Sequence, residues 1–148
     1  MTEKGMLNKK IKSHLREEDE EKKSPKEKRA ILEVLIQEGV NPDSAFAEFM
    51  STYEGEFYGE EGVMINIGAD LLDTENNLVE HFRKTYNIPK KYLPLFNLEV
   101  DDFLFYDTLN NGVTLVESSQ IDKFIAGNIQ PQWTDFNDFL IYFFDIED

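Results

Sequence analysis

The chain has 148 residues, with 30 acidic side chains, 15 basic side chains, a formal net charge of −15 and no cysteine. A chain of this length is typical of one domain and buries about 68–70% of its unfolded surface, so it needs no metal or disulfide to fold. The lack of cysteine excludes a disulfide scaffold, a thiolate metal site and a cysteine nucleophile. The negative charge argues against partners that are themselves anionic, namely nucleic acid and an acidic membrane surface.

The N-terminus shows no signal peptide, because residues 1–23 lack an apolar core. The longest apolar run, Phe139 to Phe144, is far shorter than the ~20 residues of a membrane span. The chain is therefore expected in the cytoplasm. Its 12 phenylalanines and 6 tyrosines are typical of a globular chain, since a disordered acidic chain has few aromatic residues.

Residues 1–23 are expected to be a charged N-terminal extension, followed by a single domain over residues 24–148. Three apolar residues recur at four-residue spacing and give one thin stripe, sufficient for a marginal helix: Leu7, Ile11 and Leu15. The run from Glu17 to Lys23 has no apolar residue and is typical of a solvated linker. We therefore expect the extension to be dispensable for folding.

Apolar spacing predicts four helices in the rest of the chain, and the first has the clearest start. Ser24 and Glu27 form a capping-box sequence with Pro25 at the first helical position. The predicted helices cover residues 24–38, 43–54, 74–86 and a last helix from Thr134 or Asp135. Five residues on the second and last helices are expected to share one core: Phe46, Phe49, Phe136, Phe139 and Leu140.

Strands are predicted between and after these helices, at residues 63–67, 92–96, 103–107, 113–117 and 121–126. Pro94 restricts residues 92–96 to an edge strand or an irregular segment. Asn111-Gly112 between two β-rich runs is a strong signal for a hairpin. This order predicts an α+β fold, with a mostly antiparallel sheet packed by N-terminal, inserted and C-terminal helices.

The residue types that act in catalysis or bind metals in other proteins form no recognisable catalytic set in this sequence. His14 and His81 have no second histidine at a ligand spacing and are interpreted as surface or boundary residues. Adjacent carboxylates on a strand point to opposite faces, so such pairs are interpreted as solvated. We expect no enzyme, cofactor or metal; a carboxylate metal hydrolase is the lesser alternative.

The acidic field is the remaining functional signal, because residues 41–148 alone carry a net charge of −16. Such a surface steers basic partners, although the charge can also serve solubility alone. The loop from Glu54 to Glu61 places two aromatic residues, interpreted as exposed, among carboxylates, as in an anchor with a steering rim. In the alternative interpretation Phe57 packs inward. The candidate partner-binding residues are Glu54, Glu56, Phe57, Tyr58, Glu60, Glu61, Asp101 and Asp102.

Four short motifs follow one another along the chain: residues 46–55 after Asn41-Pro42, Tyr92 to Phe96, Phe103 to Asp107 with its Asn-Gly turn and Val113, and Phe136 to Leu140. In this order they resemble the motifs of the SUKH superfamily, and the resemblance covers roughly residues 24–148. The chain departs from the family pattern at two positions. The residue before the proline is Asn41, where the family usually has Leu, and the residue before the glycine is Glu54, where the family usually has Asn.

This resemblance implies a SUKH-like fold and a function by binding. The superfamily includes bacterial immunity proteins, which neutralise a polymorphic toxin of their own or sibling cells, often a nuclease, and fungal regulators of cell-wall synthesis. The leading expectation is therefore a cytoplasmic immunity protein whose partner is a basic toxin domain. The alternative is a non-catalytic regulatory module without a toxin partner.

Overall fold

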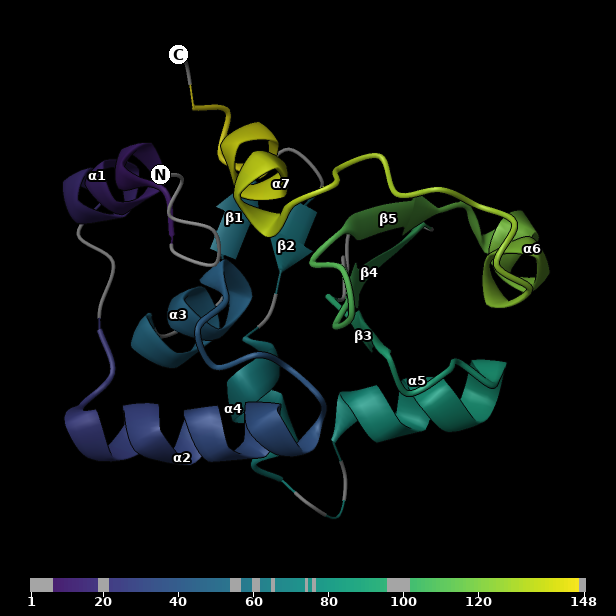
Figure 1. Ribbon diagram of the computed structural model, residues 1–148, viewed down its shortest axis with the longest axis horizontal. Helices are drawn as coiled ribbons and strands as arrows, with labels where there is room; N and C mark the ends of the chain where they lie inside the picture. Colours follow the sequence, from purple (N-terminus) through teal and green to yellow (C-terminus); the bar gives the residue numbers. More distant parts are fainter. Residues whose placement is uncertain are drawn as a thin grey trace.

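The computed structural model has the helices and antiparallel strands of an α+β fold (Figure 1). It describes residues 7–18, 22–53, 57–59, 62–64, 66–73, 75, 77–95 and 102–146. Within these residues, every pair of neighbouring strands is antiparallel, and helices from the beginning, middle and end of the chain surround the strands. The predicted fold class is confirmed.

The helices and strands alternate irregularly along the chain. The helices are α1 (Lys9–Glu17), α2 (Pro25–Gln37), α3 (Ala45–Thr52), α4 (Ile67–Leu71), α5 (Leu78–Tyr86), α6 (Ile121–Ile125) and α7 (Phe136–Phe143). A short 3-10 helix, Ser118–Gln120, precedes α6. The strands are β1 (Phe57–Gly59), β2 (Gly62–Met64), β3 (Tyr92–Pro94), β4 (Phe103–Asp107) and β5 (Val113–Val116).

The strands in the described part of the chain form two antiparallel sheets. β1 and β2 make a hairpin in which Gly59 pairs with Gly62. The larger sheet has the order β3-β4-β5, so β3 with its Pro94 lies at an edge, where proline is tolerated. β4 and β5 are joined by the predicted Asn-Gly turn, in which Asn111 adopts a φ of 66°. The edge strand and the hairpin are confirmed.

The helix starts follow local capping chemistry. The Ser24 hydroxyl accepts a hydrogen bond from the Glu27 amide at 3.2 Å, and the Glu27 carboxylate accepts one from the Ser24 amide at 3.3 Å, so the predicted capping box is present. Ser44 caps α3 in the same way, with its hydroxyl accepting from the Ala47 amide at 3.1 Å. These bonds satisfy backbone donors that the first helical turn leaves free.

Two predicted element boundaries are wrong because asparagines begin helices there. The strand expected over 63–67 ends at Met64, and Asn66 caps α4 by accepting a hydrogen bond from the Ala69 amide at 3.1 Å. The helix expected from residue 74 starts at Leu78, after its cap Asn77. Asparagine at an N-cap accepts a hydrogen bond from an otherwise free backbone donor, so the two helices begin directly after Asn66 and Asn77.

The strand predicted over residues 121–126 is also wrong, because this segment forms α6. Phe124 is buried there, and its ring stacks on that of Phe105 with centroids 4.6 Å apart. Asp122 and Lys123 are exposed. The segment therefore buries one face with helical spacing, which a short run of five or six residues does not distinguish from a strand.

α1 belongs to the main core, contrary to the expectation of a separate extension. Leu7, Ile11 and Leu15 are each at most 1% exposed. The Glu48 carboxylate on α3 accepts a hydrogen bond from the Leu7 amide at 3.0 Å and pairs with Lys12 at 3.1 Å. The predicted apolar stripe does form a helix, and packing against α3 and α7 buries what an isolated helix would leave in water.

The five aromatic and aliphatic residues predicted to share a core do so. The Phe46 ring stacks on Tyr106 with centroids 3.8 Å apart and meets Phe136 edge-on at 5.0 Å. β4 alternates between two clusters, with Leu104 and Tyr106 in the main core and Phe105 in a smaller one under α6. The sheet therefore divides the interior, and the main core lies on the side of α1, α3 and α7 (Figure 1).

Within the described residues, none of the helices combines the length and the apolar character that crossing a bilayer requires.

Candidate functional site

The candidate aromatic loop has one buried and one exposed aromatic residue. Phe57 is 1% exposed and packs 4.6 Å from the Phe49 ring, so the expectation that it is exposed is wrong. Tyr58 is 72% exposed. Alternation along β1 explains the difference, because successive side chains of a strand point to opposite faces. The surface anchor available on this hairpin is therefore Tyr58.

The acidic candidates are only partly described by the structure. Glu54, Glu56, Glu60, Glu61 and Asp101 lie outside the described residues. Asp102 is half-buried and precedes Phe103, whose ring meets Phe82 and Tyr86 of α5. α5 lies away from the β1–β2 hairpin (Figure 1), so the structure does not bring Asp102 next to Tyr58.

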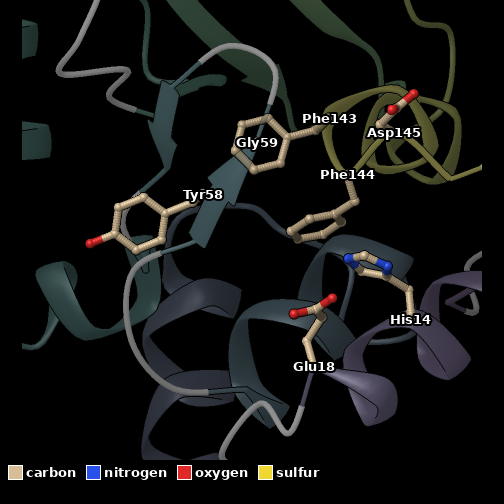
Figure 2. A pocket seen from close by; sticks show the side chains of 7 residues that line it. All are labelled: His14, Glu18, Tyr58, Gly59, Phe143, Phe144 and Asp145. Atoms are coloured by element: carbon tan, nitrogen blue, oxygen red, sulfur yellow. The ribbon is translucent and has the colours of Figure 1, made fainter.

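A pocket of about 460 Å³ opens beside Tyr58, between α1, β1 and the end of α7 (Figure 2). Its volume is within the range of ligand-sized sites. Apart from Tyr58, the lining residues come from segments far apart in the sequence: His14, Glu18, Gly59, Phe143, Phe144 and Asp145. A second hollow continues from it along α1 and shares His14 and Asp145.

Gly59 allows the hairpin to sit directly on α7. A Cβ atom at this position would overlap the carbonyl oxygen of Phe143 and lie 2.6 Å from Cδ2 of its ring. Only glycine permits such a close approach of backbone to backbone without a shift. Figure 2 shows the Phe143 ring over Gly59 and Tyr58 projecting from the other side of β1. This contact fixes the wall of the pocket that carries Tyr58.

The α1 wall is formed by His14 and Glu18, which share a helical face at a spacing of four residues. The His14 ring lies 5.1 Å from that of Phe144, tilted by 35°. Figure 2 shows the Glu18 carboxylate pointing into the space beside these two rings. Neither Glu18 nor Asp145 forms an ion pair with a basic side chain in the part of the chain that the structure describes.

The α7 wall ends in an unusual backbone conformation. Asp145 has a φ of 52°, in the left-handed region that glycine usually occupies at a helix end. Its amide donates to the Tyr142 carbonyl at 3.1 Å, and the Ile146 amide donates to the Ile141 carbonyl at 2.9 Å. This Schellman arrangement ends the helix and leaves the Asp145 carboxylate at the rim of the pocket (Figure 2).

Two buried tyrosines have raised pKa values but belong to the core. Burial raises the pKa of Tyr106, which donates a hydrogen bond to Asn111 in the β4–β5 turn. Burial, and then the nearby Glu48 carboxylate, raise the pKa of Tyr53. The described residues contain no group of three or more histidine, aspartate or glutamate side chains placed to hold a metal ion.

Sequence reasoning missed His14, Glu18 and the end of α7 as one site. His14 was interpreted as a boundary residue, and its half-buried side chain agrees with that interpretation. The pocket depends on α1 and α7 lying side by side, which no local pattern indicates. One signal was present: Glu18, Gly59 and Asp145 each lie in or next to a run of acidic residues.

Searches against protein-family models, curated proteins and solved structures found no match to this chain.

Proposed function

We propose that this chain is a cytoplasmic immunity protein that acts by binding rather than catalysis, and that it neutralises a basic toxin domain. The toxins bound by immunity proteins of the SUKH superfamily are often nucleases, so a nuclease is the expected partner. The observation that carries the binding role is the acidic pocket beside Tyr58. The choice of a toxin as partner comes from the motifs that resemble the SUKH superfamily.

The sequence segments that supply the lining of this pocket are more acidic than the chain as a whole. The pocket residues and their neighbours within three positions occupy residues 11–21, 55–62 and 140–148, which contain 11 acidic and 2 basic side chains. One of the two basic residues, Lys12, is paired with Glu48. A basic partner would be steered to this face, while an acidic competitor would be repelled.

An exposed tyrosine at the edge of such a face supports the same proposal. Tyrosine is enriched among the residues that dominate binding energy, and it provides a large contact area at little cost in side-chain entropy. Tyr58 is held by a hairpin that is clamped on α7 through Gly59. An acidic inhibitor with a rigid aromatic anchor could occupy the cleft in which a nuclease binds phosphates.

The test is protection of the producing cell. Deleting the gene for this chain should make the cell sensitive to a toxin delivered by its siblings, and supplying the chain on a plasmid should restore growth. A Tyr58→Ala chain should restore growth less well at equal protein level. Undiminished survival of the deletion strain in contact with toxin-producing siblings would contradict the proposal and favour a regulatory module.

A further inference from the structure

We infer that the pocket between α1, β1 and α7 receives an arginine side chain of the partner, with the guanidinium against the Phe144 ring and the Glu18 carboxylate. This inference rests on the proposed function for the identity of the partner. Its basis in the structure is the joint placement of an aromatic face, a carboxylate without an ion-pair partner among the described residues, and a pocket of about 460 Å³, which has room for an arginine side chain.

The aromatic contribution comes from the end of α7. Phe144 is half-buried, with one side of its ring toward His14 and its centroid 5.1 Å from the histidine centroid. It also packs 5.2 Å from Phe143 and 6.2 Å from Phe49, so its orientation is fixed by the core. A fixed aromatic face is the partner that a guanidinium plane favours.

The electrostatic contribution comes from Glu18 and Asp145. Glu18 is exposed at the C-terminal end of α1, where a negative charge is unfavourable for the helix dipole. Asp145 likewise follows the C-terminus of α7. Two carboxylates at two helix C-termini thus face one pocket without an ion-pair partner among the described residues. A cation from the partner would compensate both.

Among the described residues, no lysine or arginine side chain lines this pocket. Apart from His14, its lining contains no basic residue. Lys9 and Lys10 line the neighbouring hollow instead, on the side of α1 toward Ile146. Asp145 lines both this hollow and the pocket, whereas Glu18 lines the pocket alone, so Glu18 is the main candidate to accept a cation from the partner.

Arginine fits this pocket better than lysine for two reasons. Its planar guanidinium can stack on Phe144 while it donates two parallel hydrogen bonds to Glu18. It is also more weakly hydrated than an ammonium group, so entering a half-enclosed pocket costs less. The pocket therefore distinguishes arginine from lysine, whereas a diffuse acidic surface does not.

The test is a nuclear magnetic resonance titration of the isotopically labelled full chain with three short peptides at low salt. The peptides are acetyl-Gly-Arg-Gly-amide, its lysine analogue and its citrulline analogue, which keeps the shape of arginine without the charge. Saturable shifts at the amides of His14, Gly59 and Phe144 are expected for the arginine peptide, with weaker binding of the lysine peptide and none of the citrulline peptide.

Glu18→Gln should weaken the arginine peptide by about two- to fivefold, as expected for a partly exposed ion pair. Glu33→Gln on α2 is the matched control, because Glu33 is also exposed but does not line the pocket, and it should leave the affinity unchanged. Phe144→Leu should reduce the preference for arginine over lysine. A thermal melt of each variant checks that the fold is intact.

Equal shifts with the citrulline peptide, or non-saturating shifts spread over the whole acidic surface, would overturn the inference. Equal affinity for the lysine peptide would also overturn it. These failures are separable from those of the proposed function: a toxin that still binds while the peptides miss the pocket refutes only the arginine site. Arginine binding in the pocket of a chain that gives no protection refutes only the immunity role.

Discussion

Phe57 and Tyr58 are neighbours in β1 with opposite environments, since their exposed fractions are 1% and 72%. Phe57→Ala should lower the free energy of unfolding by about 3–5 kcal/mol, because it leaves a cavity beside Phe49. Tyr58→Ala should change it by less than about 0.5 kcal/mol, as is usual for exposed positions. Urea denaturation of the two variants checks this, and equal losses would contradict the assigned strand register.

Asp145 combines a left-handed φ with a negative charge at a helix C-terminus. Asp145→Asn keeps a residue that tolerates this conformation and removes the charge, so it should stabilise the fold by about 0.3–1 kcal/mol. It should also weaken binding of a basic partner, because a carboxylate leaves the pocket rim. Thermal melts and partner affinity measured together test this pair of opposite effects; a less stable variant would refute the dipole argument.

At the scale of elements, α1 is a part of the core. Removing residues 1–23 would expose the surface that Leu7, Ile11 and Leu15 cover, so the truncated chain should lose its cooperative melt. Ile11→Ala in the full chain should cost about 2–5 kcal/mol. Ser13→Ala on the exposed face of the same helix is the control. A sharp, unshifted melt of the truncated chain would show that α1 is not needed.

The β4–β5 hairpin is tied to α3 through Tyr106, whose ring stacks on Phe46. Burial raises the pKa of Tyr106 above the usual 10.0, so the folded state holds this proton more tightly than the unfolded state. Its stabilising contribution is full below pH 10 and falls as the pH rises above it. The urea midpoint should therefore fall above pH 10, with Tyr53 adding in the same direction. The urea midpoint of Tyr106→Phe should fall less steeply above pH 10 than that of the natural chain. An equal slope for the two chains would contradict this explanation.

The elements differ in how far the sequence alone could predict them. The capping box at Ser24 and the Asn-Gly turn depend on neighbouring residues, so they were predicted correctly. α6 was not, because a short apolar segment fits a strand or a helix until its partner, here Phe105, is known. The pocket was missed for the same reason: His14, Gly59 and Phe144 meet only through long-range packing of α1, β1 and α7.

At the scale of the whole molecule, the aromatic residues of α3 and α7 fill the interior, and the proposed binding pocket opens at the ends of α1 and α7. The sequence segments that supply the lining of this pocket contribute many of the acidic residues behind the net charge of −15. We expect this face to determine both the choice of partner and the rate of encounter.

The most direct test is the association rate with the proposed partner, a basic toxin domain, at low and at high salt. The variant replaces Glu56, Glu60 and Glu61, which flank Tyr58 in the sequence, by lysine. At low salt the variant should associate more slowly than the natural chain, and the difference should shrink at high salt, because ions screen the steering charges. Equal association rates of the two chains at low salt would contradict the account.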